Sequence, residues 1–201
     1  MNLTHKFTLL AIVISFGYLN AQVGIGTTSP SAELEVEGTN TGIPALELNP
    51  QSAPAGSATG QVAVIGDQLF MYDATRAKWL STETSVLQFS NSGNTSNTFL
   101  KYGDVANVNS GAYLPFDGTI VYIGATTSDV IGGGSTKAFD VRVNNGTTVN
   151  STTTFNLVAW KFLKTDYNVD FNAGDYINVL TPTAGGNVTN PTVTVWVKWR
   201  K

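Results

Sequence analysis

The sequence predicts an all-β protein with an extended N-terminal stalk, a small β-meander and a C-terminal antiparallel β-sandwich of the jelly-roll type. The chain is rich in Thr, Asn, Gly, Ser and Val, residues that favour strands and turns. From residue 61 onward, short apolar or alternating runs are separated by turn residues, as in sandwiches and jelly rolls. There is no cysteine among the 201 residues, so core burial, ions or association between chains must replace disulfides. Of these, we favour association.

The first residues follow the order of a secretion signal. Lys6 supplies a basic region, residues 7–19 form an uncharged apolar run, and Asn20-Ala21 is a small-residue end. This order predicts a signal peptide over residues 1–21. A membrane span needs about 20 apolar residues, and neither this run nor any later one approaches that length. We therefore expect an exported protein with no membrane span.

Residues 22–60 are predicted to form an extended, stalk-like segment. They are small and Gly-rich at first and then contain Pro44, Pro50 and Pro54 among Ala, Ser and Gly. Such a composition disfavours a packed core and favours an extended chain.

Residues 61–82 are predicted to form a small β-meander. Gln61–Ile65 and Gln68–Tyr72 flank a Gly-Asp pair that suits a tight hairpin turn. A third strand is expected to carry Trp79. A meander of this size is not stable alone, so it needs a partner surface. The polar residues 83–98 are predicted to be a linker.

Residues 99–201 are predicted to form the jelly-roll head. Thr119–Ile123 is an apolar run suited to a buried strand, and Phe139–Asn144 alternates apolar and polar residues. Asn145-Gly146 is the strongest short-range hairpin signal. Other segments are expected to form the Val130–Ser135 loop, the Thr147–Asn150 return strand, and strands at Thr154–Phe162, Tyr176–Leu180 and Thr192–Trp199.

Composition excludes several classes of function. The only histidine, His5, falls within the predicted signal peptide, and there is no thiol. The mature chain therefore lacks the groups for Ser-His-Asp or Cys-His catalysis and for the common transition-metal sites. The net charge of −3 comes from scattered residues, whereas nucleic acid requires a basic stripe. We expect neither nucleic-acid binding nor enzymatic activity.

Carboxylates offer the remaining chemistry. The acidic turns Asp117-Gly118 and Gly174-Asp175 are compatible with calcium, but the alternate-position pattern of calcium loops is missing. We therefore favour ordinary turns and no cofactor. A hydrolytic pair is conceivable among four carboxylates, but each lies in a strand or turn pattern that explains it: Asp140, Asp166, Asp170 and Asp175.

Four aromatic residues are candidates for contact with a ligand or another subunit. Trp160, Trp196, Trp199 and Tyr176 lie at strand spacing, which suits either a platform for sugar rings or burial in a core or subunit interface. Of the two roles, burial in a core or subunit interface is the more common one for aromatic residues at strand spacing. Trp196 differs, because it alternates with Val193, Val195 and Val197 and so points to the opposite face.

The N-terminal motif resembles a known segment. Residues 23–36, VGIGTTSPSAELEV, resemble the VGIGT-x-x-P-x-A-x-L-x-V segment that opens many secreted flavobacterial-type surface proteins and recurs in shafts of trimeric phage tail fibres. Residues 60–80 are similar to the β-hairpin that often follows it, although the usual Gly before Trp79 is absent.

The head carries a second resemblance. YLPFDGTI at residues 113–120 and FNAGDYINV at residues 171–179 are similar to the head domains of collagen-like spore-surface glycoproteins and C1q/TNF-like jelly rolls. The matching residues Asp117, Gly118, Gly174 and Asp175, with the Asn145-Gly146 turn, are a signature of fold. The resemblance implies a homotrimer in which three stalks wrap together below the heads.

Together these observations predict a secreted, non-enzymatic, fibre-like homotrimer at the surface of a Gram-negative bacterium. Its head would mediate adhesion or recognition through a glycan or another cell-surface ligand. Two alternatives stay open. One is a purely structural subunit of an extracellular matrix or appendage, and the other is a carbohydrate-binding module that acts as a monomer.

Overall fold

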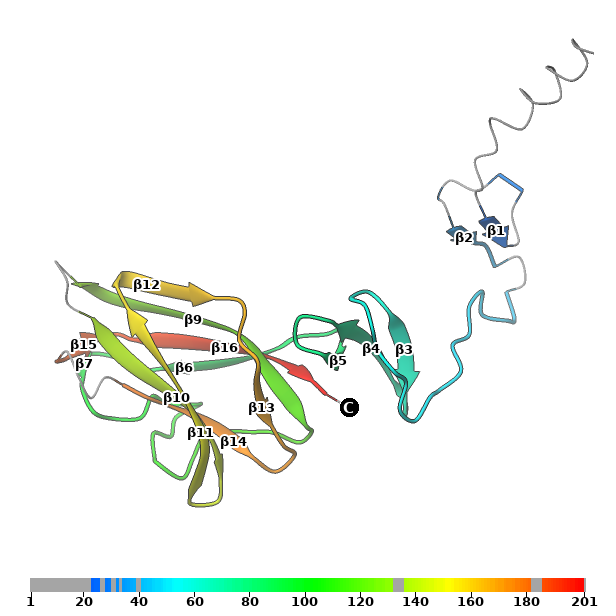
Figure 1. Ribbon diagram of the computed structural model, residues 1–201. Helices are drawn as coiled ribbons and strands as arrows, with labels where there is room; N and C mark the ends of the chain where they lie inside the picture. The colour runs from blue at the N-terminus through cyan, green and yellow to red at the C-terminus, as the bar shows by residue number, and fades with distance from the viewer. Residues whose placement is uncertain are drawn as a thin grey trace, which may run out of the picture. The chain divides into compact units, whose positions relative to one another are not determined.

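The computed structural model describes residues 23–25, 28–29, 32, 34–38, 41–131, 136–181 and 186–200. All regular secondary structure in these ranges is β (Figure 1), and no helix among them is long and apolar enough to cross a bilayer. The predicted signal peptide lies outside the described residues. The chain divides into two compact units, Met1–Asn49 and Pro50–Lys201.

The first unit contains two short strands within the predicted stalk. β1 (Val23–Ile25) pairs in parallel with β2 (Leu34–Val36), so the chain folds back here instead of running extended. Residues 41–49 form no strand, begin with turns and bends, and have exposed side chains. Ile25 and Leu34 are also exposed. A two-stranded pair with exposed apolar side chains has little stability by itself.

The predicted meander is confirmed. β3 (Val62–Ile65), β4 (Gln68–Asp73) and β5 (Lys78–Ser81) form a three-stranded antiparallel sheet. Gly66 takes a φ of 66° in the β3–β4 turn, which glycine permits. One face buries a small core formed by Ala63, Ile65 and Phe70, with Trp79 packed against it.

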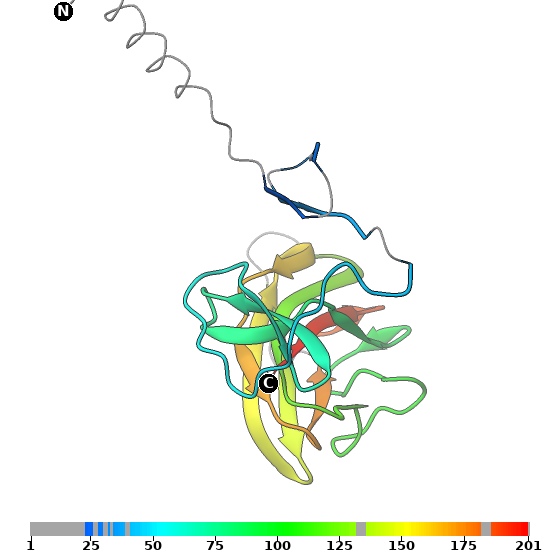
Figure 2. The ribbon, with the colours of Figure 1, turned by 90° about the vertical axis from the view of Figure 1, so that its right-hand side faces the viewer.

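The head is confirmed as an antiparallel β-sandwich. One sheet has the strand order β11-β10-β14-β8, and the other has the order β12-β9-β16-β6 with β13 also pairing with β9. Figures 1 and 2 show the two sheets as facing layers. The strands are β6 (Ser85–Ser90), β7 (Asn94–Thr95), β8 (Ala112–Tyr113), β9 (Gly118–Ile131), β10 (Lys137–Asn145), β11 (Thr148–Leu157), β12 (Ala159–Lys164), β13 (Val169–Phe171), β14 (Tyr176–Leu180), β15 (Val188–Thr189) and β16 (Thr192–Trp199).

The core lies between the two sheets and follows the alternation of their strands. Val193, Val195 and Val197 of β16 are fully buried, as the period-two pattern predicts. Within the other sheet, Phe139 of β10 and Phe155 of β11 are cross-strand neighbours in the core, and their rings stack with centroids 5.3 Å apart. Burial of this apolar surface is the main favourable contribution to folding.

Three sequence expectations within the head need correction. The segment 83–98 is not simply a linker, because β6 lies inside it and pairs with β16 along its whole length. The run at Thr119–Ile123 is part of a 14-residue strand, β9. The predicted strand Thr154–Phe162 is two strands: β11 ends at Leu157, Ala159 takes a φ of 61°, and β12 continues in the other sheet.

Candidate functional site

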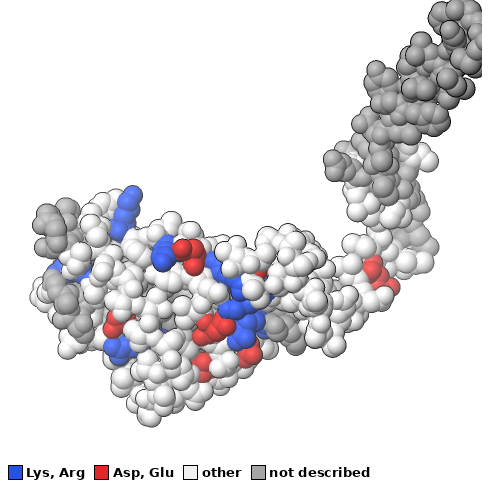
Figure 3. Space-filling view, viewed as in Figure 1, with Lys and Arg blue, Asp and Glu red and all other residues white. Residues whose placement is uncertain are grey.

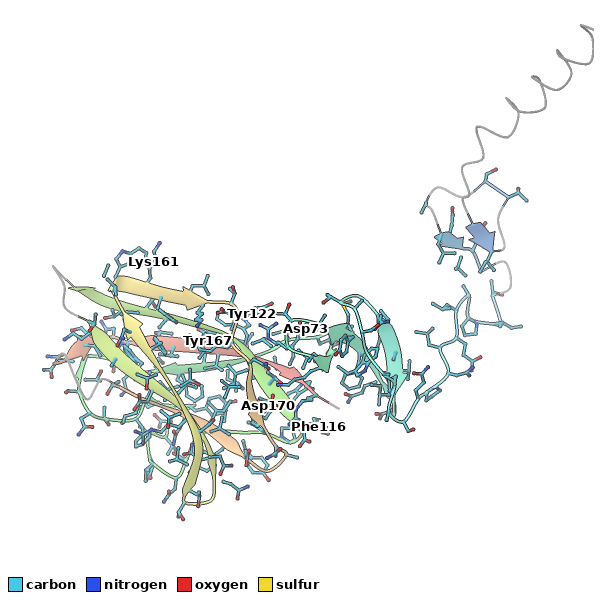
Figure 4. All side chains as sticks on the ribbon, viewed as in Figure 1. Asp73, Phe116, Tyr122, Lys161, Tyr167 and Asp170 are labelled. Carbon is cyan, nitrogen blue, oxygen red and sulfur yellow. The ribbon has the colours of Figure 1, made fainter. Side chains whose placement is uncertain are left out.

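The outer face of the five-stranded sheet has an ordered pattern of side chains. Residues directly opposite one another in antiparallel strands project to the same face, so the register places them in rows. A polar row contains Lys161, Thr126 and Thr192, the next row contains Leu163, Gly124 and Thr194, and a third contains Tyr122 and Trp196. Figure 4 labels Lys161 on β12 and Tyr122 on β9.

A hollow of about 280 Å³ lies on this face. Trp160 of β12 and Trp196 of β16 line it, with Gly124 of β9 between them in the sheet. A Cβ atom on Gly124 would lie only 3.1 Å from the Trp196 ring, so the glycine leaves room for the indole against the strand. The other lining residues are Ala125, Thr126, Lys161, Phe162, Thr192 and Thr194.

The hollow combines aromatic and hydroxyl groups. Trp160 is 50% exposed and Trp196 is half-buried, so both indoles are accessible to a ligand. Lys161 Nζ lies 5.1 Å from the centroid of the Trp160 ring, within the range of a cation–π contact. Sequence reasoning identified the two tryptophans but missed Gly124 and Lys161. The alternation of β16 did place Thr192 and Thr194 on the face of Trp196.

The other two predicted contact residues lie elsewhere. Trp199 packs between two aromatic rings, with its centroid 5.8 Å from that of Phe116 and 6.1 Å from that of Phe171. The Tyr176 hydroxyl donates to the carbonyl of Gly146 at 2.8 Å and lies 3.1 Å from the carbonyl of Val108. Trp199 therefore joins core packing and Tyr176 secures a turn. The sequence gives no signal that separates these roles from those of Trp160 and Trp196.

The predicted signature residues join three turns. Asp175 is 1% exposed, and its Oδ1 accepts from Asn145 Nδ2 at 2.9 Å, while Oδ2 accepts from the backbone N–H of Asn172. Asp117 Oδ1 accepts from the N–H of Ala173 at 2.8 Å. These bonds join the Asp117-Gly118, Asn145-Gly146 and Gly174-Asp175 turns. Gly146 and Gly174 have φ values of 58° and 89°, which suit glycine.

Gly118 is required by close packing. A Cβ atom there would lie 2.3 Å from the ring of Phe171, which no real side chain tolerates. This contact gives a physical reason for glycine at the start of β9.

The four candidate hydrolytic carboxylates have separate structural partners. Asp140 pairs with Arg142 at 3.2 Å and Asp166 with Lys164 at 3.6 Å. Asp170 pairs with Lys78 at 2.6 Å, and Asp175 joins the turns described above. Within the described ranges, no three acidic or histidine side chains cluster as a metal site requires.

Arg76, which sequence reasoning missed, joins the meander to the head. β9 pairs with β12 as far as Ile123 and with β13 from Ile120, so a gap opens beside Val121 and Tyr122. Arg76 fills it: Nη2 donates to the carbonyls of Val121 and Thr165, and Nε donates to that of Tyr167 at 2.7 Å. Its guanidinium also lies 5.9 Å from the centroid of the Tyr122 ring.

Two carboxylates complete this junction. Asp73 accepts from Arg76 Nη1 at 2.6 Å, and Asp170 Oδ1 accepts from Lys78 Nζ at 2.6 Å and from the Thr119 hydroxyl at 2.7 Å. Partial burial raises the pKa of each carboxyl, but the hydrogen bonds and cationic charges outweigh it and hold the pKa of both Asp73 and Asp170 below the usual value. Figure 3 shows charges of both signs gathered where the head meets the meander.

Comparisons with known proteins give no functional assignment. No family model matches the chain, and no curated protein matches it. Among solved structures, the crystal structure of FlhE is 14% identical, covers 60% of this chain and 100% of its own, and has a TM-score of 0.29. A TM-score this low carries no argument about fold or function.

Proposed function

We propose that this protein is a secreted, non-enzymatic, fibre-like homotrimer whose head mediates adhesion or recognition by binding a glycan. The hollow between Trp160 and Trp196 is the observation that supports this proposal best. Both tryptophans come from strands that flank β9, and both line the hollow, with the Trp196 indole lying against Gly124.

The chemistry of the hollow suits a sugar. The face of an aromatic ring carries negative charge density, which attracts the polarised C–H groups of a pyranose ring. The hydroxyls of Thr126, Thr192 and Thr194 line the same hollow and can exchange hydrogen bonds with sugar hydroxyls. A mostly apolar wall with a few convergent polar groups is the usual composition of a ligand site.

The proposed trimer is supported by the stalk-like segment considered alone. Its large aliphatic side chains at Ile25, Leu34, Ile43 and Leu46 are all exposed. Within the described residues of this segment they enter no core, so association with copies of the same segment would bury them.

A structural role without ligand binding is the alternative. Leu163 is 68% exposed and Val86 is 55% exposed, and both lie in the rows beside Gly124 and Trp196. A second chain covering this apolar face would bury both of them, and Trp196 would then be an interface residue.

A glycan array probed with the exported protein and with Trp196→Ala separates these readings. We expect the unaltered protein to bind a defined set of glycans and the variant to lose at least tenfold in affinity, with the assembled mass unchanged. Tyr113→Ala is the control, because this aromatic is 70% exposed but lies in β8 of the other sheet. Loss of assembly in Trp196→Ala would favour the structural alternative.

A further inference from the structure

The hollow carries a positive charge in a chain whose net charge is negative. Of the described residues that line it, Lys161 alone is charged, although acidic residues outnumber basic ones in the chain, 14 to 11. No carboxylate of the described residues lies within 4.0 Å of Lys161 Nζ, whereas Arg76, Lys78, Lys101 and Lys164 all have acidic partners at that range. The ammonium group therefore has no internal counter-ion in the described part of the chain.

The ammonium is also held at the hollow. The cation–π contact of 5.1 Å keeps Nζ against the Trp160 ring. The strand register adds the hydroxyl-bearing Thr126 and Thr192 to the same row. A charge and two hydroxyl groups thus lie along one side of the hollow, and Trp196 lies along the other.

From this arrangement we infer that the ligand is an acidic polysaccharide whose sugars carry carboxylates. A sugar ring in the hollow contacts the indoles of Trp160 and Trp196, and its carboxylate faces the Lys161 ammonium and the threonine row. This inference rests on the proposed glycan-binding function and names its ligand class. A single lysine matches one carboxylate on a ring, and it does not match the regular phosphates of nucleic acid, which need a series of cations.

The charge contact predicts a strong effect of salt. Because Lys161 is exposed, its attraction for an anion is screened as ionic strength rises, with a Debye length of about 8 Å near 0.15 M and about 3 Å at 1 M. Stacking on the tryptophans does not depend on charge and persists at high salt.

Affinity electrophoresis of the exported protein in gels that contain one polysaccharide each tests the inference. We expect retardation by polygalacturonate, little by neutral dextran, and at least a fivefold weaker interaction at 1 M salt. Lys161→Gln should weaken polygalacturonate binding at least tenfold. Lys101→Gln is the matched control, because this exposed lysine pairs only with the fully exposed Asp104.

Different results overturn different claims. Equal binding of dextran and polygalacturonate, lost in Trp196→Ala but unchanged in Lys161→Gln, would overturn the acidic ligand and leave glycan binding in place. Retardation by dextran sulfate but not polygalacturonate would overturn the carboxylate. Absence of binding to every glycan in the gels and on the array would remove the proposed function itself.

Discussion

At the scale of single residues, Arg76 is the residue of the meander whose guanidinium bonds three carbonyls of the head. One guanidinium satisfies three carbonyls that the strand ladder leaves open and also pairs with Asp73. Its side chain is only 12% exposed, and its bonds to Val121, Tyr167 and Asp73 are partly buried, whereas the bond to Thr165 is exposed. A buried carbonyl that loses its partner is costly, which makes Arg76 more than a surface ion pair.

We expect Arg76→Ala to lower the free energy of unfolding by about 3 kcal/mol, measured by urea denaturation. Lys101→Ala is the control, because an exposed ion pair contributes about 0.5 kcal/mol or less. Equal small effects for the two variants would mean that water replaces the guanidinium at the three carbonyls without cost.

The carboxyls of Asp73 and Asp170 predict acid sensitivity at the same junction. Their folded pKa values lie below the usual value, so their contribution to stability is complete above the unfolded pKa of about 4 and is lost as the pH falls through the folded values. We expect the thermal midpoint to fall as the pH drops below about 4. Asp170→Asn should be less stable than the unaltered protein at pH 7 and show a shallower decline. An unchanged pH profile in this variant would contradict the assignment.

At the scale of elements, β6 forms one edge of the five-stranded sheet, where it pairs with β16. Phe89 of β6 is fully buried in the sandwich core, whereas Val86 of the same strand faces outward and is 55% exposed. The strand thus has the burial pattern of a sheet member at one edge.

Substitutions on the two faces of β6 should differ sharply. We expect Phe89→Ala to cost about 4 kcal/mol, because it removes a large ring from a packed core. Val86→Ala should cost about 0.5 kcal/mol or less. Chemical denaturation of both variants measures the difference. Similar small costs would indicate that residues 83–98 behave as a linker after all.

The elements also show what the sequence could predict. Strands with a clear period of two and strong turn residues were predicted with their bounds, as at Tyr176–Leu180 and Thr192–Trp199. β6 was missed because its Ser and Gln residues alternate with only three apolar positions among many polar residues. The break between β11 and β12 was missed because Val158 and Ala159 carry no turn signal, and tertiary pairing with β9 imposes the positive φ.

The candidate site was predictable only in part. Two of the four aromatic candidates, Trp160 and Trp196, line one hollow, because the order β12-β9-β16 brings together strands that lie far apart in sequence. No local pattern encodes that order. Gly124 likewise leaves room for an indole only because β16 pairs with β9 and places Trp196 beside it.

At the scale of the whole molecule, the central prediction is the number of chains. We expect light scattering on a sizing column to give residues 22–201 three times the mass of one chain. Ile25→Ser with Leu34→Ser should weaken that assembly, because these exposed aliphatic residues belong to the stalk-like segment and serine removes their apolar surface. Thr28→Ser and Ser29→Thr are the paired control in the same segment. A monomer at every concentration would favour the single-chain binding module.

The Arg76 junction has a mechanical consequence for a protein tethered by its N-terminal segment. Tension applied through residue 50 enters the meander first. In the meander, the Arg76 guanidinium donates a hydrogen bond to the carbonyl of Val121 on β9. Val121 lies three residues before Gly124 on the same strand. Three carbonyl contacts of Arg76 therefore oppose separation of the meander from the head. If the head binds a glycan as proposed, a force on the N-terminal segment would reach β9, the strand that contributes Gly124 and Thr126 to the hollow.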